Sequence, residues 1–144
     1  MKLSTRGRYG VSAIYDIALH CQEGPVSLRL VAERQGISEH YLEQLIGQLR
    51  KAGLVKGVRG AQGGYTLAKA ADKITVGDVV RIMEGPLVPV KCLLSTKKGD
   101  KHYCENSSSC VTRNVWAKVG DSIAKVLDGI TLADLCKDSG KDVK

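Results

Sequence analysis

Large aromatic side chains and long apolar runs are scarce in this sequence. Its 144 residues include no phenylalanine and a single tryptophan, so a hydrophobic core must be built from aliphatic side chains. No stretch approaches the roughly 20 consecutive apolar residues that a membrane-spanning helix needs. The first residues, Met1 to Ser4, lead directly into an amphipathic segment and lack the apolar core of a signal peptide. We therefore expect a cytoplasmic protein with no membrane partner.

The sequence also lacks the residue patterns of common active sites. It has only three histidines, His20, His40 and His102, and neither a Ser-His-Asp arrangement nor a pair of carboxylates in a glycine-framed loop. The glycine-rich stretch GVRGAQGGY lacks the GxxxxGKS or GxxxxGKT pattern of a phosphate-binding loop and opens no helix. We therefore expect a protein that is not an enzyme.

Positive charge is in excess. The chain has 22 Lys and Arg against 15 Asp and Glu, a formal net charge of +7. This balance favours a polyanionic partner such as nucleic acid, although many soluble proteins are basic without binding one. The Lys and Arg residues are spread along both halves of the chain, which argues against a disordered basic tail.

The first 37 residues predict two helices and a tight turn. Residues 5–22 place apolar side chains on one side at helical spacing, and Gly24-Pro25 ends this helix. Ser27 is expected to cap a short second helix, and Gln35-Gly36-Ile37 to make the turn into a third. The polar residues expected off the apolar side of the first helix are Arg6, Arg8 and Asp16.

The next 30 residues predict a third helix and a hairpin. Ser38 is a good N-cap for this helix and Gly53 a good stop. Residues 54–67 read as two short strands around the tip Arg59-Gly60-Ala61-Gln62-Gly63-Gly64, which no helix would tolerate. A helix-turn-helix followed by a glycine-tipped, arginine-bearing hairpin is the outline of a winged helix.

In this arrangement the third helix enters the major groove of DNA and presents its first turns to the base edges. At the hairpin tip, the guanidinium of Arg59 could reach a narrow minor groove, and Gly60 and its neighbours allow backbone amides to approach phosphate. The alternative for both sets is an ordinary solvated surface. The residues expected to contact DNA are Ser38, His40, Tyr41, Glu43, Gln44, Arg59 and Gly60.

The second half of the chain predicts a long helix preceded by an irregular, cysteine-bearing loop. A capping box at Thr75 to Asp78 opens a helix that ends near Gly85, and residues 92–110 are polar and irregular. From Val111 apolar residues recur every four positions, so this helix needs a partner. The partner could be the first helix of the same chain, but pairing with a second copy suits a winged helix that reads two half-sites.

The sequence therefore predicts a mainly α fold: a winged helix-turn-helix with a small β-hairpin wing, plus a long C-terminal dimerisation helix. The expected parts are a DNA-binding domain at 1–85, a cysteine-bearing loop at 86–110, a dimerisation helix and short terminal helix at 111–136, and a polar tail at 137–144. The short terminal helix opens with a second capping box, Thr131 to Asp134.

Five cysteines in a reducing compartment indicate buried thiols, metal ligands or redox sensors rather than disulfides. Cys21 and Cys136 lie on amphipathic helices and are interpreted as buried. Cys92, Cys104 and Cys110 share the irregular loop with basic residues that would lower their pKa values. Their spacing matches no recognised metal motif, so three interpretations stay open: an iron-sulfur site, a zinc site completed by His102, or a free-thiol switch.

Several motifs together resemble a known family. They are KLSTRGRYG, ERQGISEHYLEQL, LRKAGLVKGVRGAQGGY, ITVGDVVRIMEGP and ITLADL. They resemble the winged-helix bacterial repressors that include the iron-sulfur regulator IscR, the nitric-oxide sensor NsrR and the cysteine-metabolism regulator CymR, with the IscR branch nearest. The resemblance implies a homodimeric repressor of palindromic, double-stranded promoter DNA, with Glu43 reading bases and Arg59 entering the minor groove.

In the IscR branch the resemblance also implies a [2Fe-2S] cluster on Cys92, Cys104 and Cys110, through which iron-sulfur status, oxidants or nitric oxide would be sensed. The histidine that completes the ligand set in that branch corresponds here to Arg113, a cation that cannot ligate iron in that way. The fourth ligand stays open between His102, Glu105 and a residue of a second subunit. The alternative is a cofactor-free, zinc or thiol-switch regulator of cysteine metabolism, as in the CymR branch.

Overall fold

The computed structural model describes residues 3–95 and 97–140. The expected tail at 137–144 therefore lies partly outside the described residues. The helices and strands follow one another along the chain as α1 (Thr5–His20), η1 (Cys21–Glu23), α2 (Leu28–Gln35), α3 (Glu39–Lys51), β1 (Val55–Val58), β2 (Gly64–Leu67), η2 (Ala71–Lys73), α4 (Val76–Glu84), η3 (Lys91–Leu94), α5 (Val111–Asp128) and α6 (Leu132–Asp138), where η marks a 3-10 helix. The prediction of a mainly helical winged-helix fold is confirmed.

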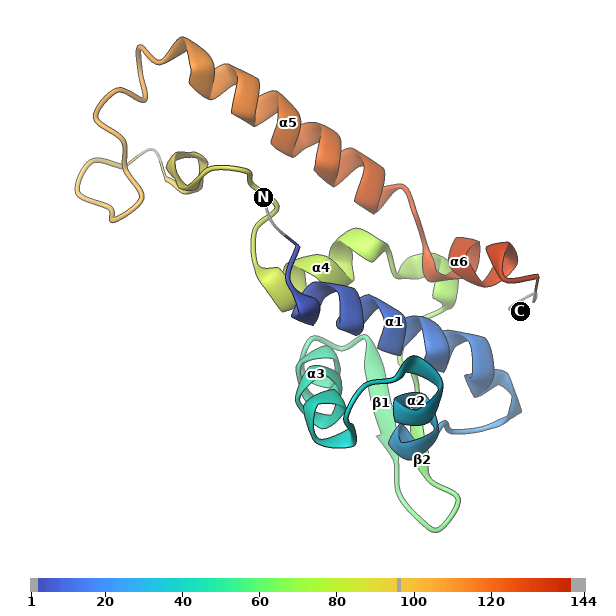
Figure 1. Cartoon of the computed structure of the whole chain (residues 1–144). Helices are drawn as coiled ribbons and strands as arrows, with labels where there is room; N and C mark the ends of the chain where they lie inside the picture. The colour runs from blue at the N-terminus through green and yellow to red at the C-terminus, as the bar shows by residue number, and fades with distance from the viewer. Residues whose placement is uncertain (1–2, 96, 141–144) are drawn as a thin grey trace.

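The core is aliphatic and is centred on α1, which runs between α4 above and α2, α3 and the hairpin below (Figure 1). Its fully buried members include Ile14 and Ile17 of α1, Leu42 and Ile46 of α3, and Val79 of α4. The expected helix over 5–22 ends at His20, and its last residues form the 3-10 turn η1 instead. None of the helices within the described ranges is long and apolar enough to cross a membrane.

Two glycines let α1 and α4 pack closely. A Cβ atom built on Gly10 would lie 2.7 Å from Met83 Cγ, and one on Gly7 would lie 2.6 Å from Glu84 Oε1. Glu84, the last residue of α4, uses this proximity to cap α1, because its carboxylate accepts hydrogen bonds from the Ser4 and Gly7 amides at 3.1 and 2.9 Å. Two free amides at this end of α1, those of Ser4 and Gly7, are thus satisfied from another helix.

The C-terminal helix α6 returns to the core. Leu132 and Cys136 are fully buried in the hydrophobic core around α1, and the Leu132 amide donates to the Ile74 carbonyl at 2.9 Å. Both predicted capping boxes are present: the Thr75 and Asp78 pair opens α4, and the Thr131 and Asp134 pair opens α6.

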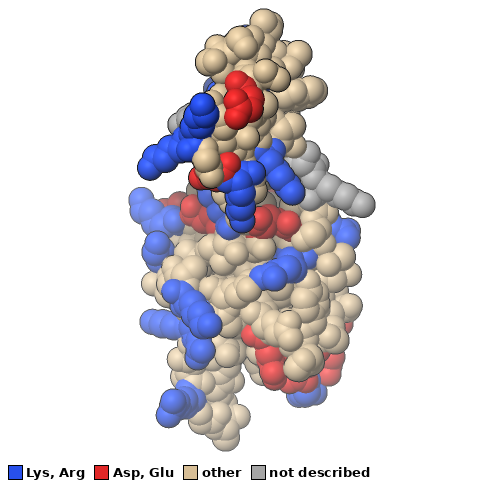
Figure 2. Space-filling view, turned by 90° about the vertical axis from the view of Figure 1, so that its left-hand side faces the viewer, with Lys and Arg blue, Asp and Glu red and all other residues tan. Residues whose placement is uncertain are grey.

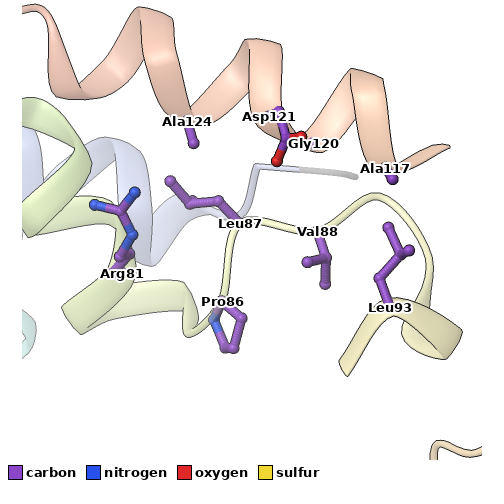
Figure 3. Close-up of a pocket in the computed structure, with 9 residues that line it drawn as sticks. All are labelled: Arg81, Pro86, Leu87, Val88, Leu93, Ala117, Gly120, Asp121 and Ala124. Carbon is purple, nitrogen blue, oxygen red and sulfur yellow. The ribbon is translucent and has the colours of Figure 1, made fainter. Parts of the chain in front are cut away.

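The long helix α5 runs along the top of the molecule, and the cysteine-bearing loop lies at its N-terminal end (Figure 1). Gly120 packs against the segment after α4, where its Cβ position lies 3.1 Å from Pro89 Cδ. In Figure 3 the side chain of Leu87 points toward α5, whereas those of Pro86 and Val88 point away from it. The exposed apolar side chains of α5 are Val111, Val115, Trp116, Val119 and Val126.

Candidate nucleic-acid interface

The turn between α2 and α3 is built from local signals. The Ser27 hydroxyl accepts from the Leu30 amide at 3.4 Å and opens α2, which ends at Gly36 with a left-handed φ of 65°. Ser38 then caps α3 by accepting from the Tyr41 amide at 3.2 Å. These two caps and the intervening glycine set the direction in which α3 leaves the turn.

The outward face of α3 carries most of the predicted base-reading residues. Leu42, Leu45 and Leu49 are buried, and this orientation leaves Ser38, His40, Glu43 and Gln44 exposed. Tyr41 differs, because it is only half-exposed and its ring packs edge-on against Tyr9 of α1, with centroids 6.1 Å apart and planes at 78°. Four of the five predicted α3 residues thus share an exposed polar surface, and Tyr41 lies at its edge.

The hairpin is a short, well-registered wing. Val55 pairs with Leu67 and Val58 with Gly64, which leaves Arg59 and Gly60 exposed at the tip. Gly63 must be a glycine, since a Cβ atom there would lie 2.1 Å from the Val58 carbonyl oxygen. The base of the wing is tied to the helix-turn-helix by two hydrogen bonds between the backbones of Tyr65 and Val26, at 2.8 and 2.9 Å.

A basic groove connects the wing with the end of α3. Its lining includes Arg50 of α3, Lys56 of β1 and Arg59 at the tip. In Figure 2 Lys and Arg side chains gather along one side of the molecule down to the lowest tip, whereas Asp and Glu gather on the opposite side of the lower part. This distribution gives one edge of the α3 face a positive potential that suits phosphate groups.

The first turn of α1 adds one more cation beside α3, which sequence reasoning missed as part of this surface. Arg6 donates a hydrogen bond to the side-chain oxygen of Gln48 in α3. Arg6 is exposed, whereas Arg8 lies on the side of α1 that faces α4 and α5. No sequence pattern reports that residues 42 positions apart are neighbours, so only the packing of α1 on α3 could reveal this contact.

The three loop cysteines lie at different points of the loop. Cys92 is in η3, Cys104 follows a turn, and Cys110 is the N-cap residue of α5; all three are partly exposed. Within the described residues, no three His, Cys, Asp or Glu side chains come together in a group that could hold a metal ion. The hydrogen bonds found in the loop are local, such as Tyr103 amide to Asp100 carbonyl at 2.9 Å.

The cysteines differ in chemistry. The Thr112 hydroxyl, 3.2 Å from Cys110 Sγ, lowers the pKa of that thiol, with help from the backbone and the positive charge of Arg113. Burial instead raises the pKa of Cys136, which fits its interpretation as a core thiol. Cys21, interpreted in the same way, is only half-buried. Arg113 Nε is buried without a hydrogen-bond partner among the described residues.

Comparison with known proteins agrees with this architecture. The profile of the Rrf2 family, described as iron-dependent transcriptional regulators, matches residues 3–138. The transcriptional regulator CymR of Bacillus subtilis is 44% identical over 135 residues, covering 94% of this chain and 89% of CymR. The regulator IscR of Aliivibrio salmonicida is 45% identical over 139 residues, covering 96% of this chain and 79% of IscR.

A solved structure named T. potens IscR superimposes with a TM-score of 0.77 at 53% identity, covering 96% of this chain and 88% of that one. These relatives are named as transcriptional regulators and not as enzymes, which confirms that prediction. The chain therefore belongs to the Rrf2 family of transcriptional regulators.

Proposed function

We propose that this regulator is a cytoplasmic, homodimeric repressor that binds promoter DNA in a sequence-specific way. The observation that carries the proposal is the exposed polar face of α3, flanked by the arginine-tipped wing. A helix of this kind in the major groove presents its first turns to base edges, and the wing then lies over the neighbouring minor groove. We assign base reading to Ser38, His40, Glu43 and Gln44, and minor-groove binding to Arg59 with the Gly60 backbone.

Phosphate binding would come from both flanks of α3. The wing side carries Arg50, Lys56 and Arg59, and the opposite side carries Arg6. A helix in the major groove has a phosphate strand along each edge, so cations on both sides contribute affinity without reading sequence. Tyr41 would contribute at the edge of the face, where its ring already packs on Tyr9.

The test is a titration of labelled duplex DNA from the promoter of the regulator's own gene, at several salt concentrations, against a scrambled duplex of equal length. We expect tighter binding to the promoter, with the logarithm of affinity falling linearly as the logarithm of salt rises. Equal affinity for both duplexes at every salt concentration would contradict sequence-specific binding.

The apolar side chains along α5 support a dimer. Val111, Val115, Val119 and Val126 are exposed and lie within one stripe of the helix. A stripe of this kind on a DNA-binding chain suits a two-fold contact with a second copy, which would place two α3 helices on two half-sites.

For the signal, we propose that Cys92, Cys104 and Cys110 hold a [2Fe-2S] cluster. Thiolates are the ligands that such clusters require, and the three thiols lie on one loop, with Cys110 close to the positive charge of Arg113. The loop must rearrange to bring the three sulfurs together, since the described residues do not gather them. When bound, a cluster would supply one-electron redox chemistry and a labile fourth position, for which His102, Glu105 and a residue of a second subunit are the candidates.

The alternative is a cofactor-free, zinc or thiol-switch regulator. It is favoured by the similarity to CymR and by the lowered pKa of Cys110. Iron and zinc content and the visible absorbance of protein purified without oxygen separate the two. We expect iron and a visible absorbance band that disappear when Cys92, Cys104 and Cys110 are replaced by Ala but persist in Cys21→Ala. Colourless, iron-free parent protein would support the alternative.

A further inference from the structure

Asp16 is a buried charge that the DNA-contacting surface does not use directly. It lies on α1 with a relative exposure of 1%, and among the described residues it is the buried charged side chain of the core. Burying a carboxylate in this way is costly unless charged or polar partners surround it. Its partners are therefore informative about what this residue does.

All the strong partners of Asp16 come from the end of α2. Arg34 donates from Nε to both carboxylate oxygens, at 3.2 and 3.0 Å, and from Nη2 to Oδ1 at 2.6 Å. Gln35 donates from Nε2 to Oδ2 at 2.9 Å. His20, one turn further along α1, has its Nδ1 3.4 Å from Oδ1. The Asp16 carboxylate thus accepts hydrogen bonds from both the guanidinium of Arg34 and the side-chain amide of Gln35.

Arg34 and Gln35 are the last two residues of α2, directly before the turn at Gly36 that leads to the Ser38 cap of α3. The three hydrogen bonds from Nε and Nη2 of Arg34 fix the in-plane orientation of its guanidinium, and the bond from Gln35 fixes the next residue. The carboxylate therefore holds the chain at the point where a small rotation would swing the whole of α3. Elsewhere α3 is held by its caps, by its apolar stripe, and by the contacts of Gln48 with Arg6 and of Tyr41 with Tyr9.

We propose that Asp16 is a positioning residue for DNA reading: through Arg34 and Gln35 it sets the orientation of α3 relative to the wing and thereby the selectivity for the operator. This inference rests on the proposed DNA-binding function. It predicts that loss of the carboxylate lowers selectivity, while non-specific attraction to DNA persists, because the cations that attract phosphate are unchanged.

The experiment compares full-length Asp16→Asn with the parent for binding to the promoter duplex and to a scrambled duplex. We expect the ratio of the two affinities to fall roughly tenfold, about the loss caused by one mismatched base pair, with binding to the scrambled duplex unchanged or tighter. Asp128→Asn is the matched control, because it makes the same charge change at an arginine-bound aspartate, paired with Arg81 at 2.7 Å, in α5.

Arg34→Lys is the second variant, because it keeps the positive charge but cannot make the fork and is mild enough to fold if Asp16→Asn does not. We expect a smaller loss of the same ratio, and effects of Asp16→Asn and Arg34→Lys that are not additive in the double variant. If both variants fold and bind both duplexes with the parent's ratio, or if both affinities fall equally, the positioning role is wrong. A parent that shows no preference for the promoter would instead remove the proposed function itself.

Discussion

Arg59 has the most specific expected role of any single side chain, because it is exposed at the wing tip with a cationic groove behind it. We predict that Arg59→Ala weakens binding to the promoter duplex by roughly 1 to 3 kcal/mol and reduces the preference for A/T-rich flanks. Fluorescence anisotropy measures both effects. Lys137→Ala, which removes an equal charge from an exposed position of α6, is the control and should change affinity little.

Glu43 should act differently, because a carboxylate accepts a hydrogen bond from cytosine N4 and repels phosphate elsewhere. Its replacement by Ala is expected to change which bases are tolerated more than it changes overall affinity. Selection from a randomised duplex library reports this directly. If Glu43→Ala and Arg59→Ala both lost affinity for the promoter duplex to the same extent, with unchanged base preference, the two residues would not have separate roles.

Gly10 allows α1 and α4 to pack closely because it has no side chain at their contact. Its Cβ position is 2.7 Å from Met83 Cγ, so we predict that Gly10→Val lowers the free energy of unfolding by about 1 to 3 kcal/mol through overpacking. Gly47 of α3 has no heavy atom within 4 Å of its Cβ position and is the matched control. Urea denaturation of both variants should show a loss at Gly10 and no loss at Gly47.

Among the elements, α1 depends on a cap that α4 supplies. Hydrogen bonds from the Ser4 side chain and from the Gly7 and Ser4 amides hold the pKa of Glu84 below its ordinary value. A lowered pKa in the folded state means that the stabilisation is present at neutral pH and is lost as the pH falls through the folded-state pKa. The cap should therefore weaken only in acid.

We predict that Glu84→Ala lowers the free energy of unfolding at neutral pH by about 0.5 to 2 kcal/mol, the usual loss on removing a helix N-cap. The difference between parent and variant should shrink as the pH is lowered below the ordinary carboxyl range. Thermal unfolding followed by circular dichroism at several pH values measures this. Glu33→Ala, which breaks an exposed pair with Arg29 on α2, should cost far less.

For the molecule as a whole, the exposed stripe of α5 predicts assembly with a second copy. Val119→Glu puts a charge into the stripe and should shift the protein from dimer to monomer in sedimentation experiments. Binding to a two-half-site duplex should fall, while binding to a single half-site should be retained. Asn114→Glu adds the same charge to the same helix outside the stripe; a monomer in both variants, or a dimer in both, would contradict the assignment.

Much of this protein was determined locally, and such features could be predicted from the sequence. Ser27, Ser38, Thr75 and Thr131 all cap helices because a short hydroxyl side chain satisfies free amides within three residues. The hairpin tip could be predicted from its glycines, because Gly60 adopts a positive φ and Gly63 leaves no space for a Cβ atom. The apolar spacing of α3 also determined which of its residues face outward, since helical period alone relates buried to exposed positions.

Other features were decided only by tertiary structure, because they join residues far apart in the chain. Asp16 was expected off the apolar side of α1, which is wrong: it is buried, at a spacing of three from Ala13, because Arg34 and Gln35 reach it from α2. The docking of α6 on α1, the Glu84 cap and the Arg6 contact with Gln48 have the same origin. Apolar periodicity predicts the buried face of a single helix, whereas the partner of a buried charge depends on how several helices pack together.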